Sequence, residues 1–297
     1  MSSLSWGPVR STRHLSLELE LKVSARPLEN VIRRDRLVVL AALAAITGLA
    51  WVYIAYLAWD MQHMGMQHMD MEHMEMEMDM PMEMAMPQMQ AWRPVEYLLM
   101  FVMWAVMMVG MMVPSAAPMV LMFTSVNRRR REQQRPYVPT GVFLAGYLAV
   151  WTAFSALATV AQGALHKAAL LSPSMVSTSP VVGGVLLLAA GIFQWTPLKY
   201  ACLHHCRSPL SVITREWREG TRGAFIMGLR HGMYCTGCCW FLMALLFVAG
   251  VMNLLWIAAI AAFVLVEKVV PAGHWVARVA GVLLVVAGAL MIGGYLD

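Results

Sequence analysis

The stretch from Met61 to Met89, MQHMGMQHMDMEHMEMEMDMPMEMAMPQM, holds 13 methionines and three histidines. From Met74 to Met86 a methionine stands at every second position, and the residues between are acids, Pro and Ala, which a buried strand would not carry. Thioether sulfur is a soft ligand that needs no deprotonation, so it favours Cu(I) over hard cations, and imidazole extends the range to Cu(II). In an extended chain, side chains two positions apart lie ~6.6 Å apart on one side, within reach of a shared ion.

We therefore predict that this stretch captures copper, with Cu(I) preferred. The alternatives are a linker lengthened by repeat expansion, or a store of sacrificial, oxidisable methionines. The predicted ligands are the methionines and histidines of its first two thirds: Met61, His63, Met64, Met66, His68, Met69, Met71, His73, Met74, Met76, Met78 and Met80.

The five cysteines form two groups, CLHHC from Cys202 to Cys206 and RHGMYCTGCCW from Arg230 to Trp240. On a helix, His231, Cys235 and Cys239 share one face because they are four residues apart, and Cys238 is three residues from Cys235. Thiolates and imidazoles at this density suit Cu(I), with Zn(II) as the alternative. The predicted ligands here are Cys202, His205, Cys206, His231, Cys235, Cys238 and Cys239. The alternative is that these cysteines are ordinary small apolar residues of a helix interior.

A methionine stripe follows the loop in YLLMFVMWAVMMVGMMVPSAAPMVLMF, Tyr97 to Phe123. Met103, Met107 and Met111 are four residues apart and so fall on one helical face. Pro114 and Pro118 are expected to break the helix, with Ser115 satisfying a freed backbone group. The stripe predicts either a relay for a soft cation or simple packing by flexible side chains.

Hydropathy indicates the elements that carry these residues. The chain is 60% hydrophobic and 13% charged, which is typical of a polytopic membrane protein. Apolar runs long enough to cross a ~30 Å hydrocarbon layer predict an all-α fold of about seven transmembrane helices. The runs are 37–59, 97–126, 140–165, 181–198, 233–252, 253–270 and 276–295.

Lys and Arg residues fall mainly on one predicted face of the membrane: seven before Leu37, five in 127–135 and five in 199–222. The opposite face has few of them, and the Met-rich loop there is acidic. The positive-inside rule then predicts a cytoplasmic N-terminus and a loop outside the bacterial inner membrane. The net charge of +5 is therefore interpreted as a consequence of this orientation and not as a sign of nucleic-acid binding.

The expected organisation is a cytoplasmic tail (1–36), an uncleaved first span (37–59), the Met/His-rich outer loop (60–96) and a six-helix membrane domain (97–297). With a helix beginning near Met233, Cys235, Cys238 and Cys239 should lie only ~3 to 9 Å into the membrane at its cytoplasmic side. Glu267 and Lys268 are expected to reach toward the interface, although an inward carboxylate could orient a ligating histidine.

The motifs MMVPSAAPMVL, GIFQWTPLKYACLHHCRSPL and GLRHGMYCTGCCWFLMALLFVAGVMNLLWIAAIAAFVLVEKVVPAG resemble the bacterial family of predicted metal-binding integral membrane proteins known as domain of unknown function 2182. The resemblance extends from Pro27 to the C-terminus and implies an integral membrane protein with a metal site. It directs attention to matched cysteine, histidine and charged positions: Cys202, Cys206, His231, Cys235, Cys238, Cys239, Glu267 and Lys268.

The resulting hypothesis is a copper-handling membrane protein that captures Cu(I) with its outer loop and binds it at, or transfers it to, a cytoplasmic-side Cys/His cluster. No residues are assigned to catalysis or to an organic cofactor. The expected partners are the lipid bilayer, copper ions and a copper chaperone or respiratory oxidase, with no nucleic acid. Two alternatives remain, namely a membrane thiol-disulfide oxidoreductase using Cys235 and Cys238, or an assembly factor for a copper oxidase.

Overall fold

A computed structural model of the chain describes residues 36–61, 63, 92–134, 138–168 and 179–295, and these residues are entirely helical apart from their connections. The all-α prediction is confirmed for this part of the chain. Its contacts divide the chain into two units, residues 1–42 and 43–297, and the second unit carries the features below. The labelled helices are α2 (Pro94–Glu132), α3 (Thr140–Lys167), α4 (Pro180–Phe193), α5 (Pro197–Arg207), α6 (Pro209–Glu216), α7 (Gly220–Ala244), α8 (Leu246–Ala249), α9 (Leu254–Val269) and α10 (Gly273–Ile292).

Five helical segments of the described chain are long and apolar enough to cross a membrane, or six if the bent pair α4–α5 is one span. The five are Arg36–Met61, Pro94–Glu132, Thr140–Lys167, Gly220–Ala249 and Gly273–Ile292. α9 has 16 residues, about 24 Å at 1.5 Å per residue, and is short for a ~30 Å hydrocarbon core. The chain is thus a helical protein suited to a membrane, and the predicted count of about seven spans is not confirmed by the described residues.

α2 runs without interruption through both of its prolines, so the expected break at Pro114 is wrong. Pro114 has no N–H to donate to the carbonyl of Gly110. The indole Nε1 of Trp51, on the first helix, donates to that carbonyl at 3.3 Å. Ser115 does not fill this role, because its hydroxyl donates to Met112 O at 2.9 Å. A neighbouring helix therefore supplies the hydrogen bond that the proline removes.

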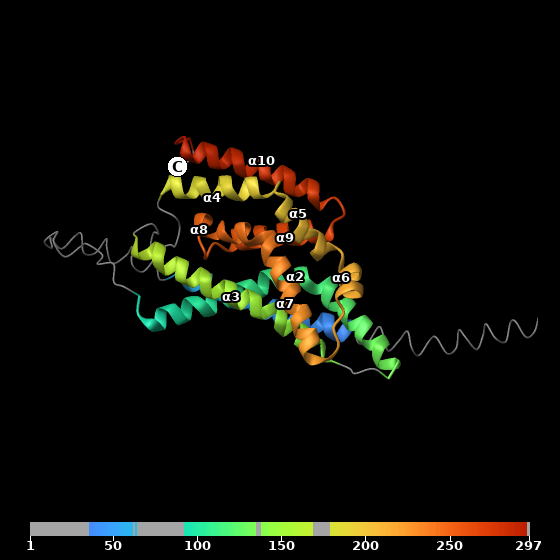
Figure 1. Cartoon of the computed structure of the whole chain (residues 1–297). Helices are drawn as coiled ribbons and strands as arrows, with labels where there is room; N and C mark the ends of the chain where they lie inside the picture. Colours follow the sequence, from blue (N-terminus) through green and yellow to red (C-terminus); the bar gives the residue numbers. More distant parts are fainter. Residues whose placement is uncertain (1–35, 62, 64–91, 135–137, 169–178, 296–297) are drawn as a thin grey trace, which may run out of the picture. The chain divides into compact units, whose positions relative to one another are not determined.

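Glycines set how closely two helix pairs approach. Where α3 meets α7, a Cβ on Gly228 would lie 2.0 Å from the carbonyl oxygen of Phe143, and one on Gly146 would lie 2.2 Å from that of Phe225. α4 and α10 lie side by side (Figure 1), and Gly184 and Gly288 each face the other's carbonyl oxygen. Small residues at such contacts bring backbones together, which is the main source of packing energy between helices in lipid.

The predicted span 181–198 is a bent pair, with 63° between α4 and α5. Pro197 begins α5, and the Thr196 hydroxyl before it accepts the Lys199 N–H as an N-cap. A residue preceding proline is held in extended backbone, so the chain cannot continue α4 straight into α5. The bend turns α5 so that it packs on α7 and α9 (Figure 1).

α7 begins at Gly220, earlier than the predicted start near Met233. Cys235 and Cys239 are 15 and 19 residues from that start, or about 22 to 29 Å along the helix at 1.5 Å per residue. The cysteines therefore lie in the middle of the Gly220–Ala249 segment and not within its first turns. The predicted helix start is therefore wrong, because hydropathy marked only the apolar part of a longer helix. The depth of the cysteines in the membrane stays a prediction.

Candidate metal centre

Cys235 of α7 is where side chains from several helices meet. Its sulfur accepts a hydrogen bond from Lys268 Nζ of α9 at 2.9 Å, and it is 3.1 Å from the Tyr147 hydroxyl of α3. Cys235 is 1% exposed and Tyr147 is fully buried. A sulfur with an ammonium group and a phenol in contact is held in a polar pocket inside an otherwise apolar bundle.

α2 joins this network through the Ser115 side chain and the Met112 backbone carbonyl. Lys268 Nζ also donates to Ser115 Oγ at 3.1 Å, and Ser115 Oγ donates in turn to the Met112 carbonyl. The Tyr147 hydroxyl donates to the same carbonyl at 3.1 Å. Four helices, α2, α3, α7 and α9, are therefore tied together around Cys235 by hydrogen bonds.

Cys238 and Cys239 follow Cys235 on α7 and are equally buried. Both thiols donate to the Cys235 carbonyl, each at 3.0 Å. Such back-bonding to a carbonyl three or four residues earlier satisfies a polar side chain inside its own helix. It also brings both sulfurs to the same carbonyl oxygen, beside Cys235.

The second cysteine group reaches the first because α5 packs against α7. Side-chain interactions join Cys206 to Cys235 and to Cys238. Cys202 lies against the bare backbone of Gly237, where an added Cβ would be 2.9 Å from the Cys202 sulfur. Both α5 cysteines are half-buried. The two groups that are separate in sequence thus form one assembly, which we call the cysteine cluster (Cys202, Cys206, Cys235, Cys238 and Cys239).

Two predicted histidine ligands flank the cysteine cluster. His231 lies one turn before Cys235 on α7, is 4% exposed, and has the rings of Phe143 and Tyr147 beside it at 6.1 and 5.6 Å. His205 of α5 stacks on Tyr234 of α7, with ring centroids 4.1 Å apart. Its Nδ1 is 2.9 Å from the Ala201 carbonyl of its own helix. His231 is therefore an interior side chain and His205 belongs to the α5–α7 contact.

Beside the cysteine cluster lies a buried ion pair between α5 and α9. Lys199 Nζ is 2.6 Å from Glu267 Oε1, and the two side chains are 2% and 1% exposed. Lys199 also donates to Gln194 Oε1 at the end of α4. The expectation that Glu267 and Lys268 reach the interface is wrong, because both are buried. Glu267 orients a lysine and not a histidine.

The side chains as placed do not form a finished metal site. Among the described residues, no group of three or more His, Cys, Asp or Glu side chains is arranged to hold a metal ion. The hydrogen bonds give the reason, since Cys238 and Cys239 turn toward a carbonyl and Cys235 toward Lys268. Soft sulfur donors are close together, and rotation about their Cα–Cβ bonds would be needed to bring them onto one ion.

The methionine stripe of α2 is buried in the protein interior. Met103, Met107 and Met111 are 3%, 1% and 1% exposed, and their neighbours Met108 and Met112 are fully buried. Gln162 Nε2 of α3 contacts the Met100 sulfur at 3.8 Å. The stripe thus runs through a packed interface and ends beside the Ser115–Lys268–Cys235 network.

Most of the predicted loop ligands lie outside the described residues: Met64, Met66, His68, Met69, Met71, His73, Met74, Met76, Met78 and Met80. Of this set the structure describes Met61 and His63. His63 stacks on Trp59 with ring centroids 4.0 Å apart, and its Nδ1 is 2.8 Å from the Trp59 carbonyl. These two residues are placed at the end of the first helix.

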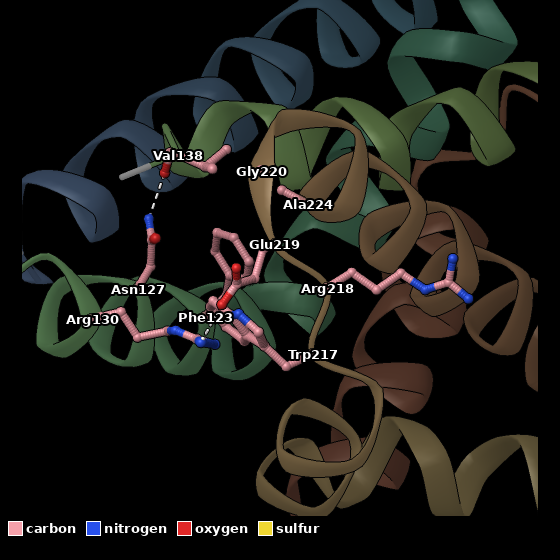
Figure 2. Close-up of a pocket in the computed structure, with 9 residues that line it drawn as sticks. All are labelled: Phe123, Asn127, Arg130, Val138, Trp217, Arg218, Glu219, Gly220 and Ala224. Carbon is pink, nitrogen blue, oxygen red and sulfur yellow. Dashed lines mark hydrogen bonds and ion pairs between the residues drawn. The ribbon is translucent and has the colours of Figure 1, made fainter. Parts of the chain in front are cut away.

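A separate, small pocket lies between the end of α2 and the start of α7 (Figure 2). Arg130 crosses it to pair with Glu219, Nη2 to Oε1 at 2.7 Å, and its guanidinium lies over the Trp217 ring. Asn127 donates to the Val138 carbonyl on the opposite wall. The ion pair occupies the polar part of this pocket, and no residue of the cysteine cluster lines it.

Sequence reasoning missed Tyr147, Ser115, Lys199 and Gln194 as neighbours of the cysteine cluster. Ser115, Gln194 and Lys199 stand in motifs quoted above, but the spacing within a motif does not predict these contacts. Ser115 and Tyr147 contact residues that are 153 and 88 positions away, and Lys199 pairs with Glu267 of another helix. A polar residue inside a predicted membrane span is itself a signal of function or pairing, and that signal could have found Lys199 and Ser115.

Comparison of the sequence with models of protein families shows which family the chain belongs to. A family described as PpoB2, copper chaperone, matches residues 101–291, which include α3 to α9, all five cysteines, and most of α2 and α10. No curated protein and no solved structure matches the chain. The match covers well over half of the sequence and begins after the Met-rich loop. The chain therefore belongs to the copper chaperone family PpoB2.

Proposed function

We propose that this protein is a membrane-embedded copper chaperone that holds Cu(I) at the cysteine cluster and passes it to a copper-requiring partner. The observation that carries the proposal is the meeting of Cys206 from α5 with Cys235 and Cys238 from α7 inside a helical bundle. Membership of a copper chaperone family supports copper as the cargo. Thiolate sulfur favours Cu(I), and Zn(II) is the competing ion at such ligands.

In the proposed site, Cys235, Cys238 and Cys239 supply sulfur and His231 is a further donor on the same face of α7. Cys206 of α5 lies beside this site. The thiols of Cys238 and Cys239 would leave the Cys235 carbonyl by side-chain rotation, and backbone movement would not be required. Lys268, in contact with Cys235, offsets the negative charge of the thiolates that hold the ion. The surrounding apolar helices exclude water and oxidants.

The proposed path begins at the outer face of a bacterial inner membrane. The Met/His-rich loop collects Cu(I), and the buried stripe of Met103, Met107 and Met111 leads toward the cysteine cluster. This orientation rests on the distribution of Lys and Arg. α2 has 39 residues, about 58 Å at 1.5 Å per residue, so its arginine-rich last turn extends beyond the hydrocarbon core. A copper oxidase or a soluble chaperone is the proposed receiver.

The test is Cu(I) retention by the full chain, purified in detergent under reducing conditions and titrated against a competing cuprous chelator. Wild type should retain Cu(I), while Cys235→Ser and Cys238→Ser should lose most of it, because each removes a buried sulfur donor. The matched control is Thr236→Ser, which places the same serine side chain on the same helix. Equal retention by wild type and both cysteine variants would contradict the proposal.

Two further variants separate this function from its alternatives. Deletion of Met61–Met89 should reduce copper capture at low concentration and leave retention by the cysteine cluster intact. An oxidoreductase would instead be unaffected by copper and by this deletion, and Cys238→Ser would trap a mixed disulfide through Cys235. Trapping of that species in the absence of copper would favour the oxidoreductase.

A further inference from the structure

The five cysteines of the cluster differ in how far a molecule from outside can reach them. Cys235, Cys238 and Cys239 are each 1% exposed, and they lie on α7, against which α3, α5, α4 and α9 pack. Cys202 and Cys206 of α5 are half-buried. Cys206 therefore has contacts on both sides, with the buried sulfurs of α7 on one side and an accessible surface on the other.

The outward side of Cys206 is polar and fixed in place. The last two turns of α5 carry His204, His205 and Arg207. Polar and charged side chains are costly in the lipid interior, so these turns should face water. Arg207 Nη2 donates to the carbonyls of Val270 and Pro271 at 2.8 and 2.7 Å, which fastens the end of α5 to the α9–α10 connection. His205 stacked on Tyr234 fixes α5 to α7.

Copper transfer between thiolates proceeds by ligand exchange, in which a new sulfur bonds to the ion before an old one leaves. An incoming thiol cannot reach a Cu(I) bound only to Cys235, Cys238 and Cys239, because protein surrounds these residues. The incoming thiol can reach a Cu(I) ion that has moved to Cys206 or Cys202, because these two cysteines are only half-buried. Because α5 packs on α7 and side-chain interactions join Cys206 to Cys235 and Cys238, Cys206 lies one exchange step from the buried site.

Building on the proposed function, we infer that Cys206, with Cys202 beside it, is the port through which Cu(I) leaves the buried cysteines for a soluble thiol-bearing carrier. Cys206 loses its proton and bonds to Cu(I), the bond from Cu(I) to Cys238 breaks, and Cys238 takes up a proton. A carrier thiol then loses a proton and bonds to Cu(I). The remaining bonds from Cu(I) to the α7 cysteines and to Cys206 break in turn, and each released thiolate takes up a proton. Copper remains Cu(I) throughout, and no electron is transferred.

The experiment measures Cu(I) transfer from the loaded full chain, in lipid nanodiscs, to glutathione as the acceptor thiol. For wild type the rate should rise with glutathione concentration, as associative exchange requires. Cys206→Ser, loaded to the same copper content as wild type, should transfer its copper about tenfold more slowly or worse, because the exchange loses the half-buried ligand between the α7 sulfurs and the acceptor thiol. Ala201→Ser on the same helix is the control and should transfer at the wild-type rate.

A transfer rate that does not depend on glutathione concentration, or an unchanged transfer rate in Cys206→Ser, would overturn the proposal that Cu(I) leaves through Cys206.

A measurement without copper separates failure of this exit route from failure of the proposed function. In the metal-free chain, a water-soluble alkylating reagent should modify Cys202 and Cys206 before the three α7 cysteines. The opposite order would overturn the port, whereas a wild type that retains no copper at all would contradict the proposed function.

Discussion

At the scale of single residues, the interior holds more charge than an apolar bundle normally accepts. Lys199, Glu267 and Lys268 are all buried, and each touches a group that offsets the cost of leaving water. Lys199 and Glu267 join the cysteine-bearing α5 to α9, next to Lys268, which contacts Cys235. The ion pair thus lies where it can fix the distance between the two cysteine groups.

Breaking this pair should destabilise the protein strongly. Glu267→Gln or Lys199→Met leaves a buried charge without its partner, which costs about 3 to 5 kcal/mol. The double variant Lys199→Met with Glu267→Leu removes both charges and should recover much of that loss. Thermal unfolding of the purified protein in detergent measures this. Additive losses in the double variant would show that the two residues do not act as a pair.

At the scale of helices, glycines and prolines determine how the elements meet. Gly228 lets α7 lie directly against α3, and the bend before Pro197 brings α5 onto α7. Pro114 does not interrupt α2, because Trp51 of the first helix bonds to the carbonyl that it leaves free. The cysteine cluster depends on two of these contacts, α3 with α7 and α5 with α7.

Substitution of Gly228 by Ala should therefore loosen the bundle. The added Cβ would lie 2.0 Å from a backbone carbonyl that no side-chain rotation can move. Overpacking of this kind typically costs about 1 to 3 kcal/mol. Gly141→Ala, on α3, is the matched control because nothing lies within 4 Å of its Cβ position. Equal unfolding temperatures for the two variants would contradict the close α3–α7 contact.

Helix periodicity predicted that His231, Cys235 and Cys239 share one helical face, and they follow one another at single turns of α7. Whether the two cysteine groups meet could not be read from the sequence, because it depends on how α5 packs on α7. The Lys199–Glu267 and Tyr147–Cys235 contacts could not be predicted, because they join residues far apart in sequence through the packing of particular helices. The start of α7 was missed because its first turns are polar and hydropathy marks only apolar length.

At the scale of the whole molecule, the account depends on which side of the membrane each end of α2 occupies. α2 leads from Pro94, just after the Met-rich loop, to the arginines that follow Asn127. If α2 crosses once, these ends lie on opposite sides, and the arginine-rich end should be cytoplasmic.

Alkaline phosphatase inserted in the chain tests this orientation, because it gains activity only where its disulfides form outside the cytoplasm. An insertion after Gln90 should be active and one after Gln134 inactive. The reverse pattern would invert the proposed direction of copper capture and leave the helical packing unchanged.

The central claim is that sulfur from α5 and α7 binds Cu(I), and X-ray absorption at the copper edge tests it most directly in a chain lacking Met61–Met89. Loaded under reducing conditions, this chain should hold about one Cu(I) with a coordination shell dominated by sulfur, and Cys235→Ser with Cys238→Ser should abolish it. Retained copper surrounded only by oxygen and nitrogen, or no retained copper in the loop-deleted chain, would contradict the account.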